Sequence, residues 1–430
     1  VLCVVFCMAI VSIAFGNLCE NTSKGHTLSS ETEWNIEIID TSGDVGLYSS
    51  LVVNEEGVQL CSYYDKTNGD LKFAMGRGEE WTIQIVDSEG DVGLFTSLAI
   101  DSKGNPYIAY YDNTNHDLKY AYWDDQEECW IIETLDSEGD VGWSSSLVID
   151  SSDIPHISYH DFTNNQLKYA TIRDGEWWIE VVDNGGLYNS IDIKPDGRPC
   201  IAYTGADGGL KYAEYTGETW LTVTVDDEVE GWDVSLDVDS YGRAHVSYYG
   251  NGFLKYAVGE YLEFLVEEVD YVTYGGWGSS IDTYNGVPSI RYYDYENKDL
   301  KYAKKVSGEW IVETVDTIGD VGQFSSLYLK DGFAHITYYD ATNGDLKKVI
   351  EGTIITGDIE IEAVFQPVQV VWLEFSGLYT NDLHKVKKDY WVATLPMIEG
   401  KNTLLFGYPT KDLALEGIMV NVTNDYAEKK

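Results

Sequence analysis

The sequence predicts an all-β protein built from a repeated unit, and three observations support this. Aromatic residues make up 13% of the 430 residues, with 33 Tyr against 4 Met, and aromatic and β-branched residues favour strands. No long stretch carries a sustained helical period. A segment of the form W-x-I-E-x-V-D returns at intervals of 43 to 49 residues, and its seven starts are Trp34, Trp81, Trp130, Trp177, Trp220, Phe264 and Trp310.

Each unit holds four short strands, with Gly, Asp, Asn and Ser between them. In the third unit the strands are WIIETL (130–135), SSLVID (145–150), PHISYHD (155–161) and QLKYA (166–170). Four strands in a unit of this length is the period of a β-propeller blade. One such sheet cannot bury both faces, whereas neighbours in a closed ring bury them for one another. We therefore predict a seven-bladed β-propeller over residues 34–352.

The register of the strands predicts how the ring closes. Strands such as SSLVID are expected to lie innermost, with their Ser residues bonded to backbone near the crowded axis. The N-terminal strand 34–39 is then left over, and the last unit ends at 346–350 without an outer strand. We expect the first strand to complete the last blade.

The repeated unit resembles a known family. Segments such as TSLAIDSKGNPYIAYYDNTNHDLKYA, residues 96–121, resemble a family of secreted propeller-repeat proteins of archaea and bacteria that is largely uncharacterised. The resemblance covers residues 34–350. It implies a propeller fold and an extracellular address, but no activity. Units four to six depart from the pattern because they lack the G-D-V-G turn.

The two ends of the chain differ from the repeat. Residues 1–16 form an apolar run, which predicts either a signal peptide cleaved before Asn17 or an anchoring segment retained in an assembly. Residues 17–33 are expected to be a linker. Residues 353–430 alternate apolar and polar residues and predict a small immunoglobulin-like β-sandwich. It has few strands for such a domain, so either some are hidden near 385–388 or an open edge could accept a strand from another chain.

Charge and cysteine usage limit the partners and the location. The chain carries 73 acidic and 28 basic residues, a formal net charge of −45. Such a field repels nucleic acids and anionic lipid surfaces. The six cysteines match no zinc or haem spacing. Asn21 and Asn421 stand in glycosylation sequences. With the apolar leader, these features predict an extracellular or cell-surface protein.

A Leu-Lys pair recurs in every unit, in a strand that should face the core. A Lys should not be buried alone, so we expect neighbouring carboxylates to neutralise it as a structural ion pair. An Asp ends the Trp strand in all seven units, at Asp40, Asp87, Asp136, Asp183, Asp226, Asp270 and Asp316. A second Asp ends the third strand in five units, at Asp65, Asp112, Asp161, Asp294 and Asp340.

The G-D-V-G turns suggest a second role for acidic residues. Closely spaced carboxylates in Gly-rich turns can hold calcium, which prefers six or more oxygen ligands, although Asp also caps tight turns through its own backbone. If a calcium cofactor binds, the candidate ligands are Asp44, Asp91, Asp140 and Asp320.

An aromatic residue precedes each inner strand, on the rim where these turns lie. Such a ring of aromatics either wedges neighbouring blades apart or offers flat faces on which sugar rings stack. The candidate ligand-binding residues are Tyr48, Phe95, Trp143, Tyr188, Trp232, Trp277 and Phe324.

Catalytic signals are weak. The chain shows no Ser-His-Asp signature, nucleophile elbow, phosphate loop or H-E-x-x-H motif. We therefore predict a non-catalytic protein with a structural or adhesive role, such as a subunit of a surface filament or matrix. Self-assembly would use the apolar N-terminal segment or the open edge of the C-terminal domain. The alternatives are a propeller that binds glycan or peptide at the aromatic rim, and a polysaccharide-active enzyme.

Overall fold

The computed structural model describes most of the repeat region and little of the two ends. The described residues are 29–78, 80–227, 231–260, 262–272, 278–356, 383–387, 390–394, 402–407 and 419–422. Residues 36–350 form one compact unit, and 1–35 with 351–430 form another. The predicted signal segment 1–16, most of the linker 17–33 and Asn21 lie outside the described residues. No helix in the described part of the chain is long and apolar enough to cross a membrane.

The strands of the repeat region pair into antiparallel four-stranded sheets, which we number as blades 1 to 7 in the described chain. Blade 1 contains β2 (Val45–Val53), β3 (Gln59–Asp65), β4 (Asp70–Arg77) and β5 (Glu80–Asp87). Blade 2 contains β6 (Val92–Ile100), β7 (Pro106–Asp112), β8 (Asp117–Asp124) and β9 (Cys129–Asp136). Blade 3 contains β10 (Val141–Ile149), β11 (Pro155–Asp161), β12 (Gln166–Arg173) and the first half of β13 (Glu176–Ile193).

The remaining blades repeat this order. The second half of β13 begins blade 4, which adds β14 (Pro199–Gly205), β15 (Leu210–Tyr215) and β16 (Trp220–Asp226). Blade 5 contains β17 (Trp232–Val238), β18 (Ala244–Gly250), β19 (Phe253–Glu260) and β20 (Glu263–Tyr271). Blade 6 contains β21 (Ser280–Tyr284), β22 (Val287–Asp294), β23 (Asp299–Val306) and β24 (Glu309–Asp316). Blade 7 contains β25 (Val321–Lys330), β26 (Phe333–Asp340), β27 (Asp345–Thr356) and β1 (Ser29–Asp40).

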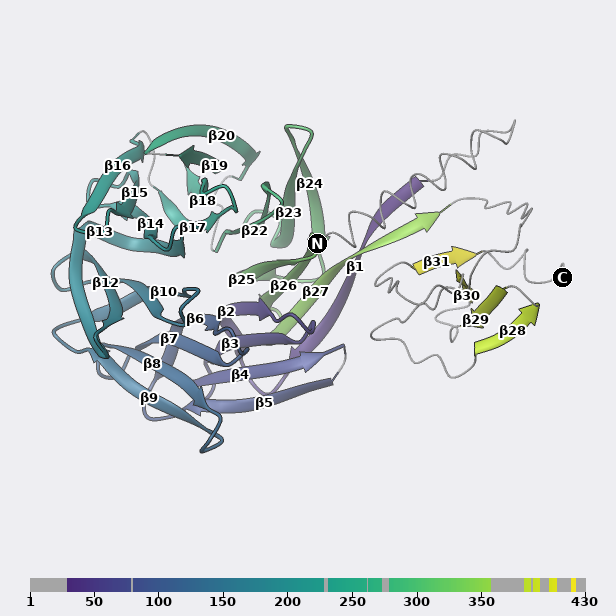
Figure 1. Cartoon of the computed structure of the whole chain (residues 1–430), viewed down its shortest axis with the longest axis horizontal. Helices are drawn as coiled ribbons and strands as arrows, with labels where there is room; N and C mark the ends of the chain where they lie inside the picture. Colours follow the sequence, from purple (N-terminus) through teal and green to yellow (C-terminus); the bar gives the residue numbers. More distant parts are fainter. Residues whose placement is uncertain are drawn as a thin grey trace. The chain divides into compact units, whose positions relative to one another are not determined.

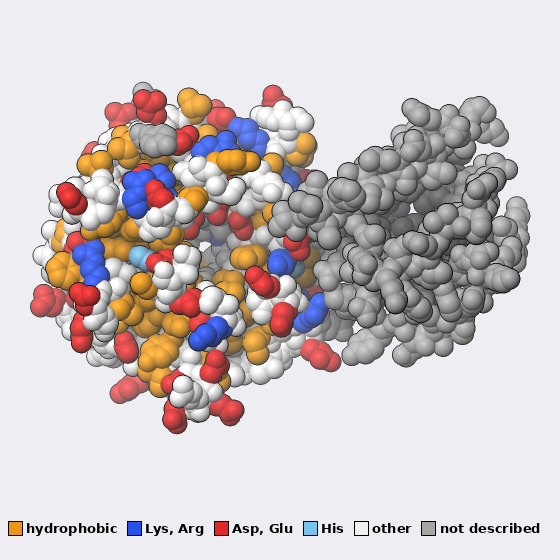
Figure 2. Space-filling model, viewed as in Figure 1, with side chains coloured by type: hydrophobic (Ala, Val, Ile, Leu, Met, Phe, Trp, Pro, Cys, Tyr) orange, Lys and Arg blue, Asp and Glu red, His pale blue; other side chains and the backbone are white. Residues whose placement is uncertain are grey.

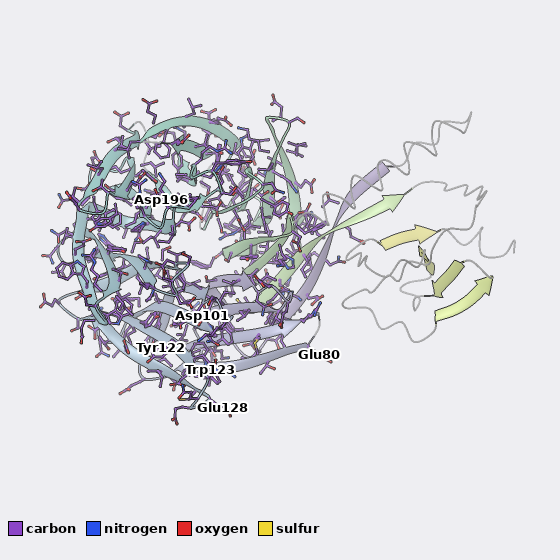
Figure 3. All side chains as sticks on the ribbon, in the orientation of Figure 1. Glu80, Asp101, Tyr122, Trp123, Glu128 and Asp196 are labelled. Atoms are coloured by element: carbon purple, nitrogen blue, oxygen red, sulfur yellow. The ribbon has the colours of Figure 1, made fainter. Side chains whose placement is uncertain are left out.

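The sheets form a closed ring, which confirms the predicted propeller of four-stranded blades. Figure 1 shows β2 to β4 beside β25 to β27, so the first and last blades are neighbours. β1 pairs with β27, as the leftover N-terminal strand requires. In Figure 3, Asp101, just after β6, lies nearer the centre of the ring than Trp123 and Glu128, at the β8–β9 turn. The first strand of each blade is therefore innermost.

A ring of side-chain hydrogen bonds joins the inner strands. On each inner strand, a Ser precedes a Leu or Ile. The side chain of that Ser accepts a hydrogen bond from the backbone N–H of the equivalent Leu or Ile in the next blade. The described residues give seven such bonds of 2.9 to 3.3 Å: Leu98 to Ser50, Leu147 to Ser97, Ile191 to Ser146, Leu236 to Ser190, Ile281 to Ser235, Leu327 to Ser280, and Leu51 to Ser326. The predicted role of these Ser residues in the scaffold is confirmed.

Hydrophobic cores lie between adjacent blades. Between blades 1 and 2, Leu71 and Phe73 of β4 pack against Val92 and Ile108 of the next sheet. Trp130, at the start of the outer strand β9, places its ring centroid 5.2 Å from that of Phe73. Burying one such Leu or Phe contributes about 1.5–3 kcal/mol. The repeated Trp strand thus covers the edge of the core between its blade and the blade before it.

The predicted ion-pair ladder is present in all seven described blades. In blade 1, Lys72 Nζ lies 3.3 Å from Asp40 and 2.7 Å from Asp65, and the Tyr63 hydroxyl donates to Asp40 over 2.7 Å. Burial acts to raise the pKa of Asp40, but the hydrogen bonds from Tyr63 and Ser42 and the charge of Lys72 lower it overall. The other Lys residues of the ladder are Lys119, Lys168, Lys211, Lys255, Lys301 and Lys347.

The C-terminal region contributes four further described strands. They are β28 (Leu383–Lys387), β29 (Tyr390–Thr394), β30 (Asn402–Gly407) and β31 (Met419–Val422). β28, β29 and β30 pair antiparallel in order, β30 pairs antiparallel with β31, and β31 pairs parallel with the end of β27. Most of 353–430 lies outside the described residues, as do all its side chains, including that of Asn421. The immunoglobulin-like domain therefore stays a prediction.

Candidate functional site at the rim of the ring

Two kinds of turn meet at one rim, as the alternation of strand direction predicts. The backbone N–H of Asp140, in the turn between β9 and β10, donates to Thr163 Oγ1 in the turn between β11 and β12 over 2.8 Å. A Cβ built on Gly139 would lie 2.7 Å from that Thr163 oxygen, and the φ of Gly139 is 103°. Only glycine fits this approach. The same N–H to Thr bond holds the turns at Asp44, Asp91 and Asp320.

Four of the predicted rim aromatics lie together in one arc. Tyr48 places its ring centroid 4.7 Å from that of Phe95 and 4.6 Å from that of Phe324, and Phe95 lies 5.2 Å from Trp143. The rings are half-buried, so they contact one another across blades and still reach solvent. Phe162 extends the arc by stacking on Trp143 at 5.6 Å. We call these five residues the aromatic arc.

In blades 1 to 3, 5 and 7 the rim aromatic stands either at a residue with left-handed backbone conformation or one position before it. Tyr48, Phe95 and Phe324 adopt left-handed conformations with φ of 56°, 51° and 49°. Such a conformation costs a residue with a Cβ roughly 1–2 kcal/mol. In blades 3 and 5 the left-handed residues are Ser144 and Asp233, and the Trp stands one position earlier.

Two of the other predicted aromatics, Tyr188 and Trp232, have no described ring contact with the arc. Tyr188 packs against the core between blades 4 and 5, and burial raises its pKa to about 12. Trp232 is 44% exposed. Trp277 lies outside the described residues. Figure 2 shows one face of the ring, with hydrophobic side chains among acidic and basic ones and a hollow at its centre.

The four candidate calcium ligands each join two blades. A Tyr hydroxyl of the preceding blade donates to Asp44, Asp91, Asp140 or Asp320 over 2.5 to 2.9 Å, from Tyr339, Tyr64, Tyr111 and Tyr293 respectively. Burial acts to raise the pKa of Asp44, but bonds from Tyr339 and Lys66 lower it overall. No group of three His, Cys, Asp or Glu residues in the described chain is placed to hold a metal ion. These bonds account for the turns without a cation, and calcium binding stays a prediction.

A set of carboxylates that the sequence reasoning missed lies on the inner strands of blades 4 to 6. Asp192, Asp237 and Asp282 occupy one strand position, where blades 1 to 3 carry Val52, Ala99 and Val148. We call the three residues the inner-strand aspartates. The N–H groups of Val238 and Leu329, each on the next blade, donate to Asp192 and Asp282 over 2.6 Å. Asp237 Oδ2 is buried without a hydrogen-bond partner.

Burial and mutual repulsion keep these carboxylates partly protonated. Burial, then the charge of Asp237, raises the pKa of Asp192 to about 8. Burial also raises the pKa of Asp237 to about 6 and that of Asp282 well above its usual value. The signal in the sequence was the change from Ser-Leu-Val and Ser-Leu-Ala to Ser-Ile-Asp and Ser-Leu-Asp in three consecutive units.

Comparison with solved structures finds distant fold neighbours. No known family and no curated protein matches the chain. AofleA from Arthrobotrys oligospora is 16% identical with a TM-score of 0.47, over 70% of this chain and 93% of that protein. The fungal lectin from Aleuria aurantia, a six-bladed β-propeller with a fucose recognition mode, is 14% identical with a TM-score of 0.42, over 66% and 98%. The polysaccharide lyase Uly1 is 10% identical with a TM-score of 0.46, over 72% and 89%.

Proposed function

We propose that this chain is a non-catalytic, extracellular glycan-binding propeller whose binding surface is the aromatic arc. The observation that carries the proposal is the run of rings from Phe324 through Tyr48, Phe95 and Trp143 to Phe162, half-exposed beside the carboxylates of the same rim. Aromatic faces suit the C–H faces of sugar rings, and carboxylates accept strong hydrogen bonds from sugar hydroxyls.

The proposal is tested by changing one ring of the arc. The full chain is applied to a glycan array, and Trp143→Ala is compared with Tyr241→Ala, a control on the β17–β18 turn that is 73% exposed. We expect Trp143→Ala to weaken glycan binding about tenfold or more and Tyr241→Ala to leave it unchanged. If Trp143→Ala lowers the Tm while binding persists, the arc is a wedge between blades.

A structural role remains a second proposal, supported by the apolar run at 1–16. In this version the N-terminal segment or the edge of the C-terminal region links copies of the chain into a surface filament or layer. The intact mass and native size of the protein from its own cells test it. A large assembly that still carries Val1 would support the structural role, and a monomer that begins at Asn17 would contradict it.

A further inference from the structure

One rim turn differs from three otherwise matching ones in how its carboxylate is held. In blade 1, Asp44 Oδ2 lies 2.9 Å from Lys66 Nζ. In blade 2, Asp91 Oδ2 accepts a 2.7 Å hydrogen bond from Asn113. In blade 7, Asp320 Oδ2 lies 3.1 Å from Lys298 Nζ. In these turns both carboxylate oxygens therefore have a protein partner.

Asp140 in blade 3 lacks the second partner. Its Oδ1 accepts from the Tyr111 hydroxyl at 2.9 Å and from Trp143 Nε1 at 2.8 Å. Phe162 occupies the position that Lys66 and Asn113 occupy in blades 1 and 2, and a Phe ring donates no hydrogen bond. Among the described residues no side chain donates to Asp140 Oδ2, so that oxygen is available to a ligand.

The side chains around this oxygen are exposed and held in place. Phe162 is 56% exposed and stacks on Trp143 with an angle of 28° between the rings. Phe162 also meets His160 edge to face, and burial lowers the pKa of His160. Phe162 is thus an aromatic face fixed next to an open carboxylate oxygen.

His116, on the β7–β8 turn of the preceding blade, supplies a second polar group near Asp140. Its side chain is 54% exposed, and its Nδ1 lies 2.6 Å from the Tyr111 oxygen. Because the single Tyr111 proton goes to Asp140, His116 Nδ1 must be the donor to Tyr111, and Nε2 is left for a ligand. The φ of His116 is 65°, at a position where blades 1 and 7 carry Gly69 and Gly344. Blades 3 and 6 carry Asn165 and Lys298 at this position, also at positive φ.

We propose that Asp140, Phe162, Trp143 and His116, the Asp140 subsite, are the principal binding site of the rim and take a neutral pyranose. This rests on the proposed glycan-binding function. The sugar stacks a C–H face on Phe162, one hydroxyl donates to Asp140 Oδ2, and a neighbouring hydroxyl bonds His116 Nε2. A sialic acid or uronic acid would bring a carboxylate against Asp140 on a chain with a net charge of −45, so acidic sugars are rejected.

The decisive variant is Phe162→Lys, which copies Lys66 of blade 1. It removes the aromatic face and places an ammonium group where it can reach Asp140 Oδ2, in a turn that tolerates Lys. The full chain is applied to an array of neutral and sialylated glycans, and the strongest ligand is titrated by calorimetry. We expect a neutral glycan, bound about tenfold or more weakly by Phe162→Lys. Asn113→Ala, at the matching position of blade 2, is expected to change the affinity less than about twofold.

A second variant tests the subsite by a gain of binding, which a loss of stability cannot imitate. Leu94→Trp with Asn113→Phe rebuilds the Phe162 and Trp143 pair beside Asp91 in blade 2, and we expect the number of bound glycans per chain to rise from one to two. If Phe162→Lys unfolds, Phe162→Asn, copied from Asn113, replaces it.

The outcomes separate the subsite from the wider proposal. A folded Phe162→Lys variant that binds the glycan normally would overturn the Asp140 subsite and leave the proposed function standing. So would a sialylated glycan as the strongest ligand. A wild-type chain that binds no glycan on the array would overturn the proposed function and the subsite together.

Discussion

Blades 1 to 3, 6 and 7 differ from blades 4 and 5 in how many carboxylates neutralise the ladder Lys: two in the first group and one in the second. Lys119 in blade 2 lies 2.5 Å from Asp87 and 3.9 Å from Asp112. Lys211 in blade 4 has Asp183 alone, at 3.2 Å, because Gly205 stands where the second Asp would be. The side chain of Lys119 is 10% exposed and that of Lys211 is 22% exposed. In blade 4, where the second carboxylate is missing, solvent thus supplies part of the compensation.

The inner strands of blades 4 to 6 carry carboxylates that no cation among the described residues neutralises. At one position blades 1 to 3 carry apolar side chains, whereas blades 4 to 6 carry the inner-strand aspartates, and no cation lowers the pKa of these three carboxylates. The regular blades therefore keep charge only where it is compensated. The divergent blades carry charge that raises their free energy at neutral pH, which a scaffold alone does not need.

Removing the ladder Lys from each kind of blade should give the largest effect. Lys119→Met leaves two buried carboxylates, Asp87 and Asp112, without their counter-ion, which costs roughly 3–5 kcal/mol of unfolding free energy. Lys211→Met leaves one carboxylate that water reaches, and its cost should be smaller by about 1 kcal/mol or more. Urea denaturation of both variants measures the difference. Equal losses would mean that the second Asp adds nothing to the ladder.

The sequence predicted the ladder and the ring closure because each follows from a constraint visible along the chain. A Lys in a core strand must have a carboxylate, and Asp40 and Asp65 recur at fixed spacing around Lys72. The first strand of the chain has no place in blade 1, and the last blade lacks its outer strand. The ring can therefore close only if the first strand pairs with the last blade.

The inner-strand aspartates and Phe162 were not predicted, because their roles depend on contacts with residues that are distant in the sequence. An Asp at position 192 reads as an ordinary polar strand residue until Val238 of the next blade is placed against it. In the sequence, Phe162 looks like an ordinary turn residue. Its stacking on Trp143 follows from the irregular register between β10 and β11, which the sequence does not reveal.

The inner-strand aspartates should make the stability fall as the pH rises. Their pKa values are raised in the folded chain, so the folded state binds more protons than the unfolded state between about pH 4 and pH 8. Their stabilising effect is full below pH 4 and is lost by about pH 8. In the triple variant Asp192→Asn, Asp237→Asn, Asp282→Asn this contribution disappears, and its stability at pH 8 should exceed that of the wild type by about 1–3 kcal/mol. Unfolding free energies at pH 5 and pH 8 test this.

A control with the opposite sign sharpens the pH test. Burial acts to raise the pKa of Asp161, but bonds from Asn164 and Lys168 lower it overall, so its contribution is lost as the pH falls through that lowered pKa. Asp161→Asn should therefore destabilise the chain at pH 8. If the triple variant and the wild type show the same pH dependence between pH 5 and pH 8, the inner-strand aspartates titrate normally.

The smallest change in stability should come from replacing two glycines that both have positive φ but differ in the atoms around them. Gly139 of the rim and Gly175 of the β12–β13 turn have φ of 103° and 85°. A Cβ on Gly139 would meet Thr163 Oγ1 at 2.7 Å, whereas a Cβ on Gly175 meets nothing within 4 Å. Gly175→Ala carries the conformational cost alone, about 1 kcal/mol, and Gly139→Ala adds the displacement of Thr163 and the loss of its bond to Asp140, about 1 kcal/mol more. Thermal unfolding of the two variants measures the difference. Equal melting temperatures would mean that the rim turns yield at no cost, and a rim that yields could not hold Asp140 and Phe162 in the fixed geometry on which the binding proposal depends.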